Sequence, residues 1–144
     1  METGLSHMEW FRRRDGSIAI SEVAARPPGA QITTLNSRAH DIDFVRAWAE
    51  VMVFGAFQRP TRKYAVGAAF LRGQGSGRIR NVHGLDQIGR EMGSLIVDVK
   101  LPVPGQAPAA SYEGDGYIIV RHPETAVVMQ ALQRLISVVK VELG

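Results

Sequence analysis

The sequence has 144 residues, of which 45% are hydrophobic, 22% charged and 7% aromatic, and a chain of this length can bury about 70% of the surface that it exposes when unfolded. It contains no cysteine, which excludes disulfides and thiolate metal sites, and its net charge of +3 is too small and too scattered to predict binding to nucleic acid. A mean hydropathy of -0.04, the absence of an apolar run near the roughly 20 residues of a spanning helix, and a start without a signal-peptide pattern predict a cytoplasmic globular protein that does not enter membranes.

The first predicted element is a β-hairpin. Extended runs at residues 6–11 and 17–24 flank Asp15-Gly16, and an Asp-Gly pair between such runs predicts a two-residue type I′ turn, because both central positions need positive φ. That turn places Glu9 opposite Glu22 and Trp10 opposite Ser21. Two prolines then end the second strand and keep the preceding residue, Arg26, extended.

Helices are predicted next. A short helix or turn is expected at residues 30–37, and an amphipathic helix from about residue 42 to 54, with Asp41 as N-cap and Gly55 at its end. Beyond a boundary near residues 58–61 the pattern predicts strands at 64–71, 78–83, 95–101, 116–120 and 138–143, helices at 85–92 and 123–136, and a Pro-rich loop at 102–108. We therefore expect an α+β fold with a mainly antiparallel sheet, divided into residues 1–59 and a small C-terminal domain of residues 60–144.

The opposed glutamates are the candidate site. They fall at a non-hydrogen-bonded pair, which brings their Cα atoms to about 4.5 Å and both carboxylates to one face. Like charges directly opposed destabilise a sheet, and a hard divalent cation neutralises them, since Mg²⁺ takes one or two protein carboxylates and completes its shell with water and phosphate oxygens. Two solvated edge carboxylates, or one protonated carboxyl that shares a hydrogen bond, are the alternatives. Arg26 adds a fixed positive charge suited to a phosphate or a carboxylate.

The segments SHMEWF (residues 6–11) and ISEVAARPPG (residues 20–29), joined through the Asp-Gly turn, resemble the metal-binding end of an ATP-grasp domain. In that family a strand with one metal-ligating Glu is followed by a strand that reads Glu-hydrophobic-Asn-x-Arg. The resemblance implies that Glu9 and Glu22 bind the Mg²⁺ (or Mn²⁺) ions on the phosphates of ATP, and that Arg26 is a catalytic residue that contacts ATP phosphate or the substrate carboxylate. Ala24 stands where the family has Asn, which removes one oxygen ligand of the second metal site.

The C-terminal half is similar to the domain that follows ATP-grasp in biotin-carboxylase-like enzymes and L-amino-acid ligases. The implied reaction forms an acyl phosphate from a carboxylate and ATP, which an amine or another nucleophile then attacks. The resemblance covers the last third of such enzymes, so we expect a fragment, a separately encoded subunit or a truncated relative, inactive alone. Its expected partners are an upstream ATP-grasp lobe or a partner subunit, and a small carboxylate or amino-acid substrate.

The alternative is a non-catalytic interaction module derived from the same fold. The predicted register puts Trp10 and Val23 on one apolar face of the hairpin, and such a face favours a homo-oligomer if it lacks a cover. Trp10 is otherwise expected in the core. The four histidines lack the spacing of metal ligands, and only His7 lies near the glutamates, where packing or a hydrogen bond to the site are its two interpretations. Binding of ATP that depends on Mg²⁺ separates the ligase from the module.

Overall fold

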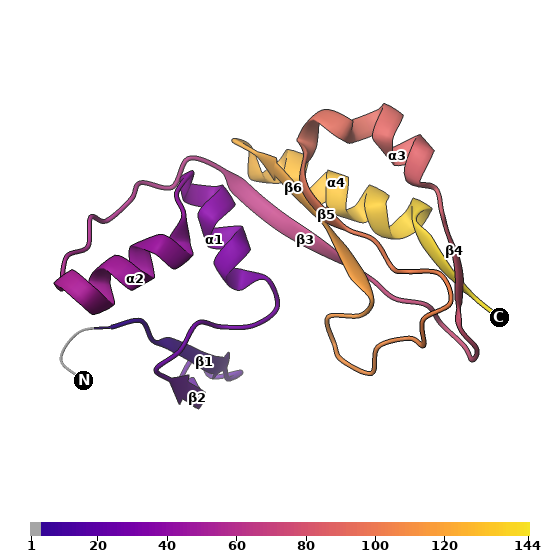
Figure 1. The fold of residues 1–144 in the computed structure, drawn as a ribbon. Helices are drawn as coiled ribbons and strands as arrows, with labels where there is room; N and C mark the ends of the chain where they lie inside the picture. The colour runs from indigo at the N-terminus through magenta and orange to yellow at the C-terminus, as the bar shows by residue number, and fades with distance from the viewer. Residues whose placement is uncertain (1–3) are drawn as a thin grey trace.

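The structure, a computed structural model, describes residues 4–144 (Figure 1). Residues 1–3, on which part of the expectation about the N-terminus rests, lie outside the described residues. The elements in chain order are β1 (His7–Arg12), β2 (Ile18–Ala24), α1 (Ile32–His40), α2 (Phe44–Phe54), β3 (Ala65–Leu71), β4 (Ile79–His83), α3 (Leu85–Met92), the 3-10 turn η1 (Gly93–Leu95), β5 (Ile96–Lys100), β6 (Gly116–His122), α4 (Thr125–Val138) and β7 (Lys140–Leu143). The predicted α+β class with antiparallel pairing is confirmed.

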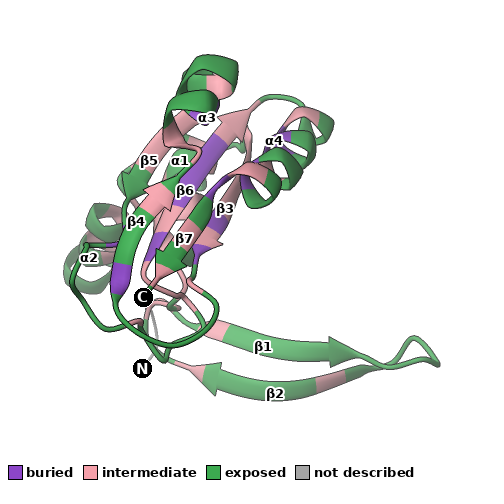
Figure 2. Cartoon of the chain, turned by 90° about the vertical axis from the view of Figure 1, so that its right-hand side faces the viewer, coloured by how far each residue is buried: buried purple, intermediate pink, exposed green. Residues whose placement is uncertain are grey.

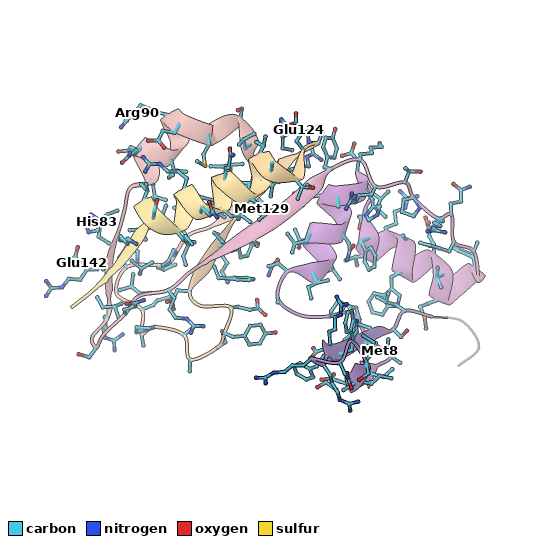
Figure 3. The ribbon with its side chains drawn as sticks, turned by 180° about the vertical axis from the view of Figure 1, so that it is seen from behind. Met8, His83, Arg90, Glu124, Met129 and Glu142 are labelled. Carbon is cyan, nitrogen blue, oxygen red and sulfur yellow. The ribbon has the colours of Figure 1, made fainter. Side chains whose placement is uncertain are left out.

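The central layer is the sheet β3-β6-β5, and the pairs β4-β7 and β1-β2 are separate two-stranded sheets. Helix α4 crosses one face of the central sheet, with α3 beside it (Figure 1). On the β4-β7 pair, His83 Nε2 and Glu142 Oε2 point toward one another at 2.5 Å (Figure 3). In the described chain the buried segments lie in the part from β3 onward, whereas the β1-β2 hairpin has none (Figure 2).

The core lies between the central sheet and α4. Gly67 of β3 permits the close packing, because a Cβ at this position would lie 2.5 Å from Leu132 Cδ1 of α4. The buried apolar cluster consists of Ala69, Leu71, Ile88, Ile118, Val120, Val128, Ala131, Leu135 and Val139. Ile119, which is also fully buried, points to the other face of the sheet because side chains alternate along a strand.

Helix α1 covers part of that other face and is joined to it by charged groups. Arg38 of α1 donates to Asp98 of β5 at 3.1 Å. Asp41 accepts from Arg121 of β6 at 3.0 Å and lies 3.5 Å from Lys63. These two cations lower the pKa of Asp41, the hydrogen bond from Arg121 being the larger cause. The segment before residue 59 therefore contacts the C-terminal sheet directly, and the division at residue 59 stays a prediction.

The boundary between α1 and α2 differs from the prediction. Asp41 does not cap the second helix; it adopts φ 60° and ends α1, where Arg121 and Lys63 hold its carboxylate. Asp43 is the N-cap instead, and its side chain accepts from the backbone N–H of Arg46 at 3.0 Å. Gly55 ends the helix as predicted, with φ 64°.

Helix α2 is apolar on nearly all sides, yet each of its residues is partly or fully exposed. One side faces an apolar pocket of about 290 Å³, whose lining includes Phe44, Trp48 and Leu5. The other side carries Val45 and Val53, which are 57% and 71% exposed. A helix that is apolar all round is normally buried, so α2 has a side suited to contact with another polypeptide.

Candidate functional site

The candidate site lies at the base of the β1-β2 hairpin, which projects from the body as an arm (Figure 2). At its tip Gly16 donates to the carbonyl of Arg13 at 3.0 Å, and Arg13 pairs with Ser17. The loop therefore has three residues, with Gly16 at φ 85°, and the predicted two-residue turn is wrong. The physical reason is Asp15, whose Oδ1 accepts from both the N–H and the hydroxyl of Ser17 and so favours this longer, three-residue loop.

A β-bulge restores the register further along the arm. Near the tip, Trp10 pairs with Ile20, one residue away from the predicted partner Ser21. The register then shifts between Glu9 and Trp10, which leaves Ser21 as the extra residue. At the base Glu9 lies opposite Glu22, as expected from the sequence. The extra loop residue and the bulge cancel each other, because each shifts the pairing by one residue in opposite directions.

The two faces of the arm have different chemistry, since opposed residues share a face. The glutamates share theirs with His7, Phe11, Ala19 and Ala24. The opposite face carries Met8, Trp10, Arg12, Ile18, Ile20 and Val23. Trp10 is 51% exposed, so the expectation that it lies in the core is wrong, because no element within residues 4–144 covers that face.

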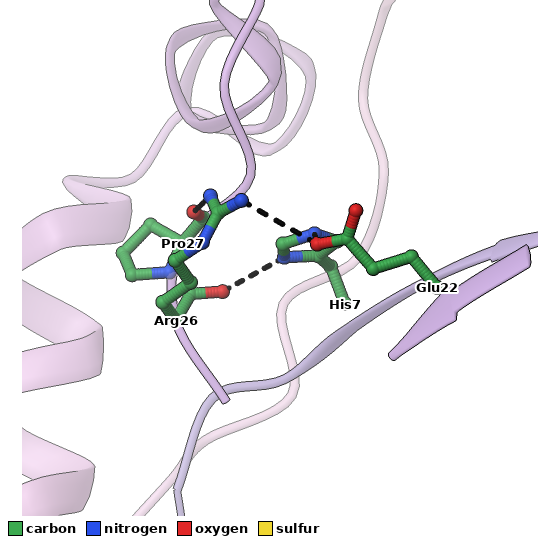
Figure 4. A network of polar contacts seen from close by, with 4 residues as sticks. All are labelled: His7, Glu22, Arg26 and Pro27. Carbon is green, nitrogen blue, oxygen red and sulfur yellow. Dashed lines mark hydrogen bonds and ion pairs between the residues drawn. The ribbon is translucent and has the colours of Figure 1, made fainter. Parts of the chain in front are cut away.

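Around Glu22 the structure brings three polar side chains together (Figure 4). Glu22 Oε1 lies 3.5 Å from the guanidinium of Arg26 and 3.6 Å from Nε2 of His7. His7 Nδ1 is 2.9 Å from the carbonyl oxygen of Arg26, and because a carbonyl only accepts, Nδ1 is the donor. The His7 side chain is 12% exposed, which makes it the most buried of the three side chains. The guanidinium also donates to the carbonyl of Pro27 at 3.1 Å.

The donor set suits a partly hydrated cation. Within residues 4–144 no group of three or more His, Asp or Glu side chains is arranged to hold a metal ion by itself. Glu9 and Glu22 are two exposed carboxylates on one face, and a hard cation with two protein carboxylates takes its remaining ligands from water and phosphate. The residues present therefore fit Mg²⁺ or Mn²⁺ carried with a phosphate ligand. Arg26 lies beside Glu22 with its side chain 61% exposed, so its guanidinium is accessible to such a phosphate.

Sequence reasoning missed the turn that follows Arg26. Ile32 donates to the carbonyl of Gly29 at 3.0 Å, and the two residues between them, Ala30 and Gln31, have φ 53° and 60°. Glu113 Oε1, on the loop between β5 and β6, accepts from the Ala30 N–H at 3.0 Å. Such a turn normally needs Asn-Gly, and its partner is remote in sequence, so the local sequence carried no signal for it.

No protein-family model and no curated protein sequence matches the chain. Among solved structures it is similar to an L-amino acid ligase from Bacillus licheniformis, with a TM-score of 0.79 and 17% identity over 98% of this chain and 36% of that one.

Two further solved structures are similar to this chain. An N5-carboxyaminoimidazole ribonucleotide synthetase from Thermotoga maritima gives a TM-score of 0.70 and 16% identity over 99% of this chain and 38% of that one. A phosphoribosylglycinamide synthetase from Anaerococcus prevotii gives a TM-score of 0.71 and 15% identity over 96% of this chain and 37% of that one. The chain thus spans between 36% and 38% of the length of these proteins, all of which are ATP-grasp ligases. The likeness shows that the chain has the fold of the C-terminal part of an ATP-grasp ligase.

Proposed function

We propose that this chain is the C-terminal part of an ATP-dependent ligase that activates a carboxylate and joins it to an amine or a related nucleophile. The observation that carries the proposal is the opposition of Glu9 and Glu22 on one face of the arm, with Arg26 3.5 Å from Glu22. Two opposed carboxylates destabilise a sheet unless a cation offsets their charge. The fold shared with an L-amino acid ligase supports the same class of reaction.

Each site residue has a role in this proposal. Glu9 and Glu22 bind Mg²⁺ or Mn²⁺, which when bound offsets the charge of the ATP phosphates. Arg26 is the catalytic residue, and its guanidinium stabilises the negative charge of the transferred phosphoryl group or holds the substrate carboxylate. In the proposed reaction a carboxylate oxygen attacks the γ-phosphorus, ADP leaves, and an amine then displaces phosphate from the acyl carbon.

The rest of the site comes from residues outside this sequence in this proposal. An isolated two-stranded hairpin is marginally stable in water, and the face with Trp10 and Val23 is 51% to 64% exposed at these residues. We infer that an upstream ATP-grasp lobe or a partner subunit covers this face and contributes the remaining contacts to ATP and to a small carboxylate or amino-acid substrate. A chain without cysteine agrees with action in the reducing cytoplasm.

Calorimetry with Mg·ATP tests the ligase proposal. The chain, co-purified with any partner polypeptide from its source cells, should bind ATP only in the presence of Mg²⁺. Glu22→Gln should weaken this binding at least about tenfold, because it removes one of the two charges that hold the cation. Glu124→Gln is the matched control, since Glu124 is an exposed carboxylate at the start of α4, and it should leave the affinity unchanged. A Glu22→Gln protein with wild-type affinity would overturn the proposal.

The exposed apolar surface favours a second candidate, a non-catalytic interaction module that forms a homo-oligomer. Met8 and Ile20 on the arm are 52% and 64% exposed, and Phe54 at the end of α2 is 75% exposed, and exposed apolar residues that gather on one face are typical of interaction surfaces. The module would show self-association and no binding of ATP that depends on Mg²⁺. The same calorimetric experiment therefore separates the two candidates.

A further inference from the structure

The turn after Arg26 is strained and needs support from residues outside the turn. Ala30 and Gln31 both lie in the left-handed region, at φ 53° and 60°, a conformation that costs about 1–3 kcal/mol for a residue with a side chain. Such residues persist where the surroundings determine the backbone. The hydrogen bond from Ile32 to Gly29 closes the turn, but it does not hold the turn against the rest of the molecule.

Glu113 provides the outside contact. Its Oε1 accepts from the N–H of Ala30 at 3.0 Å in a partly buried setting. Helix α1 begins directly after the turn, and in the described chain its N-cap residue Gln31 makes no side-chain cap bond and its first turn holds no acidic residue. The Glu113 carboxylate therefore also supplies the negative charge that a helix N-terminus favours.

The loop that carries Glu113 is itself fixed to the sheet. Asp115 donates its N–H to the carbonyl of Leu71, at the end of β3, at 2.9 Å. Its side chain accepts from the N–H of Ala109 at 2.5 Å, and the carbonyl of Ser111 accepts from Arg72 and from the N–H of Gly114. Glu113 thus transmits the position of the rigid C-terminal body to the turn at Ala30.

A stiff connection leads from this turn to Arg26. Pro27 and Pro28 lie between them, and each proline ring fixes one of the two backbone angles of its residue, φ, so this connection has fewer free angles than an ordinary segment of the same length. The Arg26 guanidinium donates to the carbonyl of Pro27, and the Arg26 carbonyl accepts from His7. A displaced turn would therefore displace the Arg26 guanidinium relative to Glu22.

We propose that Glu113 is a positioning residue, which sets the Arg26 guanidinium beside Glu22 by holding the N–H of Ala30. This inference rests on the proposed function for its catalytic meaning, because Arg26 is the residue that would contact phosphate or substrate. The positioning itself is a physical statement about the chain and can be measured without nucleotide.

The test uses the full chain and three variants: Glu113→Ala, Glu113→Gln and the control Glu124→Ala. Amide hydrogen exchange reports the Ala30 N–H, and the NMR signal of the Arg26 Nε–H group reports the guanidinium. Glu113→Ala should speed exchange at Ala30 about tenfold and shift the Arg26 signal, while amides of β6 keep their protection. Glu113→Gln retains a carbonyl acceptor and should restore both readouts, and Glu124→Ala should change neither.

Three results would overturn the inference. The first is an unchanged Ala30 exchange rate and Arg26 signal in Glu113→Ala. The second is an equal loss of protection at Ala30 and across β6, which would make Glu113 a general stabilising residue. The third is failure of Glu113→Gln to restore the readouts, which would exclude the hydrogen bond as the cause. A wild-type chain that does not bind Mg·ATP with its partner would refute the proposed function and leave these measurements valid.

Discussion

Two glycines of α3, one at its N-cap and one in its interior, differ sharply in what an added methyl group would meet. Gly84 has φ 84°, and a Cβ there would lie 2.6 Å from the carbonyl oxygen of Val138. Gly89 lies inside α3, and a Cβ there would meet nothing within 4 Å. Gly84 therefore permits the close approach of β4, α3 and the end of α4, whereas Gly89 only weakens its helix.

Replacing each glycine by alanine should change stability in opposite directions. Gly84→Ala should destabilise the chain by about 2–4 kcal/mol, because it adds left-handed strain and a backbone clash. Gly89→Ala should stabilise it by up to about 1 kcal/mol, the helix propensity that glycine lacks. Urea unfolding followed by circular dichroism measures both. A change of the same sign in the two variants would contradict this account.

At the scale of elements, a bidentate ion pair joins α3 to α4. Arg134 of α4 donates to both carboxylate oxygens of Glu91 at 2.8 Å, and Gln87 donates to one of them at 2.8 Å. The hydrogen bond from Arg134 is the largest cause that lowers the pKa of Glu91 from 4.5 to about 2. A carboxyl whose pKa is lower in the folded state stabilises that state above its unfolded pKa and loses this effect as the pH falls through the folded value.

The pair should therefore give a measurable pH dependence of stability. The thermal midpoint of the wild-type chain should exceed that of Glu91→Gln at about pH 6, and the difference should shrink as the pH falls from about 5 toward 2. Arg134→Gln should remove the same difference, because it removes the main partner of Glu91. A gap between wild type and Glu91→Gln that stays constant down to about pH 2 would count against the ion pair as its source.

Local sequence patterns predict best the elements whose bounds depend on residues nearby in the chain. Helix α3 occupies Leu85–Met92 as expected, since Ile88 gives it one buried side and glycines bound it. The second helix began two residues late because Arg121, remote in sequence, binds Asp41. The opposition of Glu9 and Glu22 was foreseen, but the turn and the bulge behind it were not. The contact between Glu113 and the turn at Ala30 had no local sequence signal, because the two residues are 83 positions apart.

At the scale of the whole molecule, the arm is the part least supported by the rest. Its apolar face carries Trp10 and Ile20, which are 51% and 64% exposed. Met8 lies on the same face of the arm, far from Met129 of α4 (Figure 3). We expect this face to drive association. The predicted register placed Trp10 and Val23 on this face correctly, but it put Ile20 on the glutamate face, and it could not show that the Trp10 face would point away from the core.

A charge on the apolar face of the arm should weaken association without unfolding the chain. The wild-type chain should sediment at micromolar concentration as a species larger than 15.8 kDa, and Trp10→Lys should shift it toward that mass. Since Trp10 is already half exposed, the free energy of unfolding should change by less than about 0.5 kcal/mol. Met129→Lys, a substitution at an apolar residue 57% exposed on α4, is the control. Equal sedimentation of wild type and Trp10→Lys would exclude this face as the interface.

The bulge at Ser21 also affects how this hairpin can be compared with others. A hairpin with a two-residue turn and no bulge would separate its two glutamates by the same number of residues as this one, and the glutamates would again be opposed. The two hairpins would differ nearer the tip, where Ile18 and Ile20 would lie on the glutamate face in one and on the Trp10 face in the other. Equal spacing in an alignment therefore says little about which surface is apolar. In this chain the proposed cation ligands lie at the base of the hairpin, and the residues whose face depends on the bulge lie nearer its tip. We therefore expect that substitutions at the tip can change the exposed apolar surface without moving the two glutamates apart.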